Sequence, residues 1–303
     1  MIDVAIIGFG HIALKHKRAL VELDQKYRIT QVVDPFDIEL SQFPYAVKQC
    51  QHIKDLDFND LDCVVVSSPS NLHFDHAEQL VNKDIKIICE KPICLEMNQL
   101  EIIKQNKRYE QNVTPFLMAQ HSPAVEHLKE ILKENTDEIE YISVRMPWRR
   151  DADYFSKNNW RGTLTGDGGI LLNQAIHYLD IIDFVFGELS VDSVIGANLR
   201  GFSSVSDRVV VHANCKKCAR VVFDLSTAED VNSPVSIECM IRGKVIKLSG
   251  NHLLRLEVGS LTYDYSETNL FLEFYKRYNL SHSDISNIKR HTTLLEKLIP
   301  MIK

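Results

Sequence analysis

The sequence predicts an α/β protein with two domains, and two patterns carry this prediction. Residues 1–119 alternate between short apolar runs and helical patterns, which is typical of a doubly wound parallel sheet. Residues 120–303 mainly carry successive strand patterns with short turns, which indicates an α+β domain with an open, mostly antiparallel sheet.

The elements of the first domain follow from its apolar spacing. The first run is apolar throughout, as expected for a strand buried on both faces of a parallel sheet. In the helical patterns, apolar side chains recur every three or four positions. The expected strands are residues 4–7, 29–33, 63–66, 85–89 and 114–118, and the expected helices are residues 11–23, 72–82 and 98–111.

The second domain has a different order of expected helices and strands. Between an early helix–strand pair and an apolar helix lies an irregular polar segment, residues 147–167. We expect helices at residues 123–134, 169–186, 267–277 and 284–302, a strand at 141–146, and one strand after another over 191–265.

The composition narrows the class of protein. Hydrophobic residues make up 45% and charged residues 25% of the chain, as in an ordinary globular protein. The net charge of −6 disfavours nucleic acid as a partner. No apolar run reaches the roughly 20 residues of a membrane span, and a strand pattern begins where a secretion signal would stand. We therefore expect a cytoplasmic protein that does not bind membranes.

Cys215 and Cys218 form the only CxxC pattern. A zinc site would need two further ligands, and no second cysteine or histidine pair supplies them. Because strand patterns flank the pair, we interpret it as the tip of a hairpin and predict no metal site.

A glycine-rich turn follows the first strand and opens the first helix. In this G-x-G-x-x-A pattern, Gly8 allows a tight turn, Gly10 lets the backbone approach a pyrophosphate, and the small Ala13 lets the helix pack on the strand. The start of a helix presents unpaired N–H groups to phosphates. We therefore expect a dinucleotide beside Phe9, His11 and Ile12.

Asp34 ends the second strand, about twenty residues after the glycine turn. A carboxylate at this position accepts hydrogen bonds from the adenosine ribose hydroxyls and repels a 2′-phosphate. The sequence therefore favours NAD over NADP.

Two further polar loops leave the ends of strands in the same sheet, where open α/β sheets bind their ligands. For His73, which lies in the first of these loops, the alternative is a purely local role: it could cap a helix or form a hydrogen bond within a loop. These expected cofactor contacts are Ser67, Ser68, Pro69, Asn71 and His73 in one loop, and Glu90 and Lys91 in the other.

These motifs resemble those of the glucose–fructose oxidoreductase/inositol dehydrogenase (Gfo/Idh/MocA) family, over nearly the whole chain. The subgroup that oxidises C3 of nucleotide-linked amino sugars is the one most similar in the second domain, over Tyr154-Phe155, Trp160-Arg161-Gly162, Gly168-Gly169 and the segment from Asn173 through His177 to Asp180. UDP-N-acetylglucosamine and its uronic acid are examples. The resemblance implies a Rossmann domain, a domain for substrate binding and oligomerisation, a homodimer or homotetramer, and a role in making sugars for surface polysaccharides.

The resemblance also implies two catalytic residues. His177 would act as the general acid or base, since its reference pKa of about 6.5 suits proton transfer near neutral pH. Lys91 would stabilise negative charge on the reacting oxygen or relay the proton. The plainer alternatives are a surface lysine and a satisfied core histidine.

The polar segment before Gly168 supplies candidates for binding the substrate. Guanidinium groups pair with phosphate, and aromatic rings stack on a base or sugar, so this segment suits a sugar diphosphate. A solvated loop is the alternative. The expected substrate contacts are Lys91, Arg149, Tyr154, Trp160, Arg161, Asn173 and His177, with Arg150 nearby.

Three functions remain open at this point. The leading one is an NAD-dependent sugar dehydrogenase. A second is a dehydrogenase or ketoreductase of a free polyol, inositol or deoxysugar, since fold alone does not decide the substrate. A third is a regulator that binds a dinucleotide without catalysis, which the presence of both Lys91 and His177 disfavours.

Overall fold

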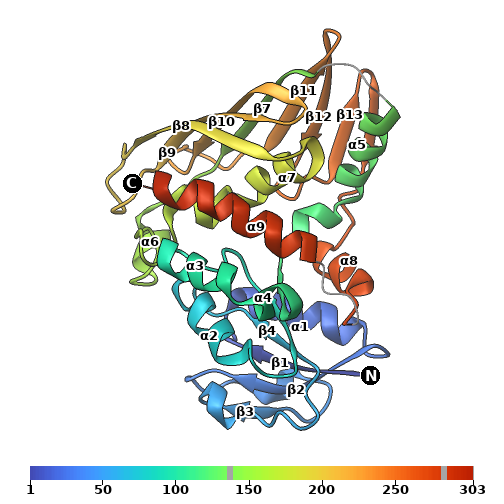
Figure 1. Ribbon diagram of the computed structural model, residues 1–303, viewed down its shortest axis with the longest axis vertical. Helices are drawn as coiled ribbons and strands as arrows, with labels where there is room; N and C mark the ends of the chain where they lie inside the picture. The colour runs from blue at the N-terminus through green and yellow to red at the C-terminus, as the bar shows by residue number, and fades with distance from the viewer. Residues whose placement is uncertain (135–138, 281–284, 303) are drawn as a thin grey trace. The chain divides into compact units, whose positions relative to one another are not determined.

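The computed structural model describes residues 1–134, 139–280 and 285–302, and its chain divides into two compact units (Figure 1). Unit 1 comprises Met1–Phe116 and Phe271–Thr293, and unit 2 comprises Leu117–Leu270 and Leu294–Lys303. No helix in the described part of the chain is long and apolar enough to cross a membrane.

Unit 1 is built on a six-stranded parallel sheet with the order β3-β2-β1-β4-β5-β6. Val4 to Ile7 are all buried, as the apolar run predicted. The strands are β1 (Ile2–Ile7), β2 (Tyr27–Val33), β3 (Lys48–Cys50), β4 (Cys63–Val66), β5 (Lys86–Cys89) and β6 (Val113–Pro115), and the helices from the first stretch of chain are α1 (His11–Glu22), α2 (His73–Leu80), α3 (Met97–Gln105) and α4 (Lys107–Asn112). The parallel sheet confirms the predicted fold class.

A break at Asn106 divides one predicted helix into α3 and α4. The side-chain oxygen of Asn106 accepts a hydrogen bond from the Arg108 N–H at 3.0 Å and so caps α4. Asparagine favours such a cap because its side chain competes with the helical backbone bonds.

Residues 271–293 differ from the sequence-based boundary, which placed all of residues 120–303 in the second domain. They carry most of α8 (Leu270–Arg277) and the first part of α9 (Ile285–Leu298), and they pack within unit 1. The reason is aromatic burial: the Phe116 ring lies 4.8 Å from that of Phe271 and 4.6 Å from that of Phe274. Residue 284, the expected start of the last helix, lies outside the described residues.

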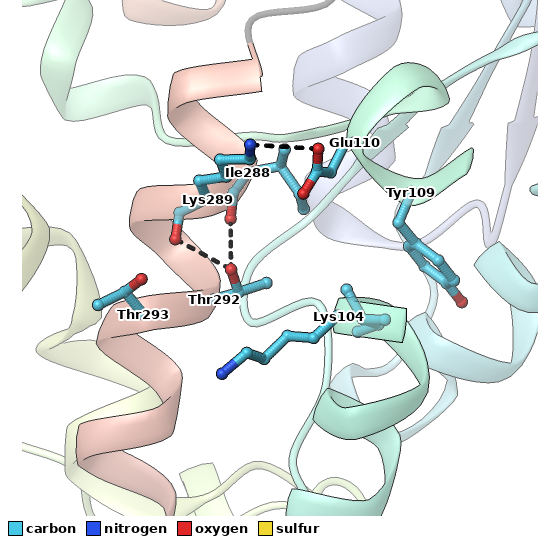
Figure 2. Close-up of a pocket in the computed structure, with 8 residues that line it drawn as sticks. Lys104, Tyr109, Glu110, Ile288, Lys289, Thr292 and Thr293 are labelled. Carbon is cyan, nitrogen blue, oxygen red and sulfur yellow. Dashed lines mark hydrogen bonds and ion pairs between the residues drawn. The ribbon is translucent and has the colours of Figure 1, made fainter. Parts of the chain in front are cut away.

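The start of α9 also lines a cavity of about 210 Å³ with α3 and α4 (Figure 2). Its wall includes the buried side chains of Ile103, Tyr109 and Ile288. Lys289 Nζ lies 3.3 Å from Glu110 Oε2, and this ion pair joins α9 to α4.

Unit 2 is built on an eight-stranded sheet with the order β14-β13-β12-β11-β7-β10-β9-β8. Only the β7–β10 pair among these described strands is parallel, which confirms the mostly antiparallel prediction. The strands are β7 (Ile139–Pro147), β8 (Leu189–Ala197), β9 (Arg208–Cys215), β10 (Cys218–Ser226), β11 (Ser236–Ile241), β12 (Lys244–Ser249), β13 (Arg255–Val258) and β14 (Leu261–Asp264). Cys215 and Cys218 lie opposite each other at the β9–β10 hairpin, where the sequence placed them.

The helices of unit 2 are α5 (Pro123–Glu134), α6 (Ala152–Ser156) and α7 (Ile176–Phe186). We expected one continuous helix over residues 169–186. Instead, a π-helical turn (Ile170–Gln174) precedes α7, and Ala175 separates the two. Asn173 and His177 therefore lie in different elements rather than on one face of a regular α-helix.

Candidate active site

The glycine turn lies where the order of the parallel strands reverses. β1 and β4 are neighbours at the centre of the sheet, although the chain passes through β2 and β3 between them. The Ser67 N–H donates to the Ile7 carbonyl at 2.8 Å, so the loop after β4 begins directly beside the turn after β1. Open α/β sheets bind their ligands at such a point.

The backbone of this turn requires glycine at its first position. Gly8 has a φ angle of +79°, and a Cβ atom added there would come within 2.5 Å of the Ser68 Cα. Ser67 Oγ also donates to the Gly8 carbonyl at 2.9 Å. Gly8, Ser67 and Ser68 thus form one close contact between two loops.

The second glycine leaves room for a ligand. A Cβ atom on Gly10 would meet no atom within 4 Å, and no described side chain caps the start of α1. The N–H groups of the first turn, which begins with His11 and Ile12, are therefore available to a phosphate.

An orphaned acceptor in the next loop supports the same ligand. Asn71 Oδ1 is buried without a hydrogen-bond partner in the part of the chain that the structure describes. Buried polar atoms are rarely left unpaired, so a donor from a bound molecule would satisfy this one. The open turn at Gly10 and the Asn71 oxygen together fit a dinucleotide, with Asp34 placed after the neighbouring strand.

His73 holds two loops together. Its ring is buried, with Nε2 at 2.8 Å from the Ser68 carbonyl oxygen and Nδ1 at 2.8 Å from the Pro92 carbonyl oxygen. Burial lowers the pKa of the imidazole, while the two carbonyls and Glu90 oppose this shift. The expected contacts Ser68 and Pro69 thus belong to a loop that His73 ties to the Lys91-Pro92 segment.

Glu90 takes part in a buried network that sequence reasoning missed. Glu90 Oε1 lies 3.1 Å from His16 Nε2, and His16 Nδ1 lies 2.7 Å from Tyr275 Oη. Glu90 is also buried; burial raises the pKa of its carboxyl, but His16, Lys91 and His73 outweigh this and leave the pKa lowered. Glu90 Oε2 accepts a hydrogen bond from the Lys91 N–H at 3.2 Å.

His291 is a second histidine that the sequence did not single out. It is fully buried in α9, and neither ring nitrogen has a hydrogen-bond partner among the described residues. Burial, followed by the positive charges of Arg290 and Lys91, lowers the pKa of His291 to about 3. His291 is therefore neutral at physiological pH.

In unit 2, aromatic and arginine side chains alternate in what we call the aromatic–arginine ladder. The Arg150 guanidinium lies 4.8 Å from the Trp148 ring centre and 5.1 Å from that of Tyr154. The Arg161 guanidinium lies 4.7 Å from Tyr154 and 5.3 Å from Trp160. Each arginine is thus held by two rings through cation–π contact.

The ladder has unsatisfied donors. The Nε atoms of Arg150 and Arg161 are buried without a hydrogen-bond partner in the described chain. Arg161 also lines a cavity of about 530 Å³ in unit 2, together with Phe155, Asn158 and Ser204 among others. Arg149 lies outside the ladder, is exposed, and donates to the Asp230 carbonyl at 3.1 Å.

The remaining expected residues of unit 2 lie around the π-helical turn. Asn173 Nδ2 donates to Asp167 Oδ2 at 2.8 Å, and the same carboxylate oxygen accepts the Gly162 N–H at 2.9 Å. Asp180 is buried and accepts a hydrogen bond from Gln120 at 2.7 Å. His177 is half-buried at the start of α7. Within the described residues, no three histidine, cysteine or acidic side chains gather as a metal site.

Two family models match the chain. Residues 2–119 match an oxidoreductase family with an NAD-binding Rossmann fold, and residues 125–245 match the GFO/IDH/MocA C-terminal domain. The chain therefore belongs to the Gfo/Idh/MocA oxidoreductase family, which confirms the resemblance and the expected cofactor, NAD.

Two curated relatives share just over a quarter of their aligned residues with this chain. An uncharacterised oxidoreductase of Streptococcus pneumoniae is 28% identical over 62% of this chain and 51% of its own length. The 2,7-anhydro-N-acetylneuraminate hydratase of Escherichia coli is 26% identical over 68% of this chain and 57% of its own. The chain thus matches about half the length of these curated relatives.

Solved structures share the fold. The WlbA dehydrogenase of Bordetella pertussis, solved with NADH and UDP-GlcNAcA, superposes with a TM-score of 0.84 at 18% identity, covering 99% of this chain and 96% of that one.

Proposed function

We propose that this protein is an NAD-dependent dehydrogenase that oxidises a secondary hydroxyl, at C3, of a nucleotide-linked amino sugar. The sugar would serve the synthesis of a surface polysaccharide in the cytoplasm. The observation that carries the proposal is the aromatic–arginine ladder, because it places two guanidinium groups with unpaired donors in the unit that does not hold the NAD motifs.

The ladder suits a diphosphate linked to a base. Phosphate oxygens accept the charge-assisted hydrogen bonds that Arg150 and Arg161 offer, and the rings keep both guanidinium planes fixed before binding. Aromatic faces also stack on a base or a sugar ring. A free polyol carries no group that uses the two arginines in this way.

The chemistry divides between two side chains. Bound NAD would supply the hydride acceptor. His177 would take the hydroxyl proton, since imidazole is the side chain whose reference pKa lies nearest to neutral pH. Lys91 would donate a hydrogen bond to the same oxygen and stabilise its developing negative charge.

The direct test follows the formation of NADH by its absorbance at about 340 nm over several minutes. UDP-N-acetylglucosamine, its uronic acid, free polyols and inositol are each offered as the substrate. A coupled aminotransferase should remove the keto product, which otherwise holds back the reaction. We expect turnover with the UDP-sugars alone. Turnover of a free polyol alone, or NAD binding without any turnover, would contradict the proposal.

Variants connect the activity to the residues. Lys91→Ala and His177→Ala should each lower kcat about 100-fold or more while NAD still binds. Arg161→Gln should raise the KM for the UDP-sugar about 10-fold, and Arg208→Gln, a change in an exposed arginine outside the ladder, is the matched control. Light scattering would test the homodimer or homotetramer that forms part of this proposal.

A further inference from the structure

Lys91 lies between two residues that buried histidines hold. On one side, the Glu90 carboxylate is 3.1 Å from His16 Nε2, and on the other, the Pro92 carbonyl oxygen is 2.8 Å from His73 Nδ1. Both imidazoles are buried, with relative exposures of 0% for His16 and 2% for His73. Each of the two residues that flank Lys91 in the sequence, Glu90 and Pro92, is therefore in contact with a buried histidine.

The two histidines come from the two helices that follow the expected cofactor turns. His16 lies in α1, which begins directly after the Gly8–Gly10 turn, and His73 opens α2, which follows the loop of Ser68 and Asn71. His73 Nε2 also lies 2.8 Å from the Ser68 carbonyl oxygen, so its ring lies between that loop and the lysine segment.

His16 is itself fixed from several sides. Its Nδ1 lies 2.7 Å from Tyr275 Oη, and its ring lies edge-on to those of Phe116, at 4.5 Å, and Phe271, at 4.9 Å. Burial raises the pKa of the Tyr275 hydroxyl well above its ordinary value, so the hydroxyl stays protonated. Because this enclosure allows the ring few orientations, Nε2 points to Glu90.

We propose that His16, acting through Glu90, and His73, acting through Pro92, are positioning residues that hold Lys91 relative to the helices of the NAD site. The inference rests on the proposed function, since it takes Lys91 as the group that acts on the substrate oxygen. Neither histidine is asked to touch substrate. A misplacement of about 1 Å in a catalytic group is enough to cost about 100-fold in rate, so fixing the lysine backbone has a measurable effect.

The test compares variants that keep or lose the hydrogen bond to Glu90. His16→Leu loses it, whereas His16→Gln places an amide N–H near the position of Nε2. We expect His16→Leu to lower kcat about 10- to 100-fold with the Kd for NAD changed less than about 3-fold, and His16→Gln to recover most of that loss. His52→Gln, at an exposed histidine of unit 1, controls for the substitution itself.

A second readout does not depend on turnover. In the protein without cofactor, the rate at which a small anhydride acylates Lys91 is measured by mass spectrometry across pH. We expect His16→Leu and His73→Leu to change this rate at least 3-fold and Glu90→Gln to move the pH midpoint of acylation downward, because a carboxylate stabilises a nearby ammonium.

The outcomes separate the two proposals. If no sugar is oxidised but Lys91 acylation responds to His16→Leu, the proposed function fails and the positioning role stands. If acylation and kcat are the same in His16→Leu and wild type, the positioning role is overturned. Where His16→Leu does not fold, Glu90→Gln takes its place as the variant that disturbs the bond, and its kcat and acylation rate are compared with those of His16→Gln.

Discussion

The Asp34 carboxylate accepts a hydrogen bond from the Phe9 N–H at 2.7 Å. This bond joins the end of β2 to the glycine turn that follows β1, so the carboxylate is anchored within the expected NAD site. Its other oxygen accepts the Phe36 N–H at 3.0 Å, which fixes the plane of the group.

The first prediction concerns cofactor choice. Asp34→Ser should weaken NAD binding and bring the ratio of NADP to NAD affinity at least about 10-fold closer to one, because the repulsion of a 2′-phosphate is removed. Fluorescence titration with both cofactors measures this ratio. An unchanged preference would mean that Asp34 does not select the cofactor.

Substitutions at the two glycines of the turn should have different effects, because Gly8 is needed for folding and Gly10 for binding NAD. Gly8→Ala should lower the free energy of unfolding by about 2 kcal/mol or more, since a side chain is strained at positive φ and the Ser68 backbone leaves no room. Urea unfolding measures the change.

Gly10→Ala is the matched control, because its surroundings are open and its φ angle is −86°. Its unfolding free energy should stay within about 0.5 kcal/mol of wild type, while NAD binds at least about 10-fold more weakly because the added methyl group stands where the pyrophosphate approaches. Equal stability of both variants would refute the packing argument.

The parallel sheet and the glycine turn after β1 could be predicted because their causes are local. Continuous apolar runs mark β1 and β4, and glycine at positions 8 and 10 marks the turn. β3 was missed because Lys48–Cys50 is a short, partly polar edge strand without alternation. The break at Ala175 was missed because the apolar pattern runs through it unchanged.

Tyr154 should matter for affinity rather than for the chemical step. Its ring lies between Arg150 and Arg161, so Tyr154→Leu removes a cation–π contact from each. We expect the KM for the UDP-sugar to rise about 10-fold with kcat changed less than about 2-fold. Tyr154→Phe, which keeps a ring in place, should stay close to wild type in steady-state kinetics, and a large fall in kcat in either variant would argue against this role.

His291 should make the protein sensitive to acid. Its folded pKa of about 3 lies below the unfolded value, so the unfolded state binds the proton first and stability is lost as pH falls below about 6.5. At pH 5.5 this linkage amounts to about 1.4 kcal/mol. His291→Leu should therefore gain more unfolding free energy at pH 5.5 than at pH 7.5, measured by urea unfolding at both values.

A further gain from His291→Leu should be visible at pH 7.5. Replacing an unpaired buried imidazole by an apolar side chain of similar size should stabilise the protein by about 1 kcal/mol. A loss of stability at both pH values would show that the imidazole has a partner in solution.

The buried histidine network lay beyond sequence reasoning for a physical reason. His16 is separated from Glu90 by 74 positions and from Tyr275 by 259, and no periodicity links them. His16 also occupies a helix position where an apolar residue would fit the pattern equally well. Arg150, Tyr154 and Arg161, by contrast, are near neighbours in sequence, so their grouping could be predicted although their stacking order could not.

Residues 271–293 belong to unit 1 although they follow unit 2 in the sequence. This limits where two genes of this family could recombine to exchange one unit. A single crossover near position 117 would transfer a Rossmann domain without Phe271, Phe274 and Tyr275, leaving Phe116 and His16 uncovered. A hybrid that exchanges residues 117–270 while keeping the core of unit 1 closed needs crossovers on both sides of that segment.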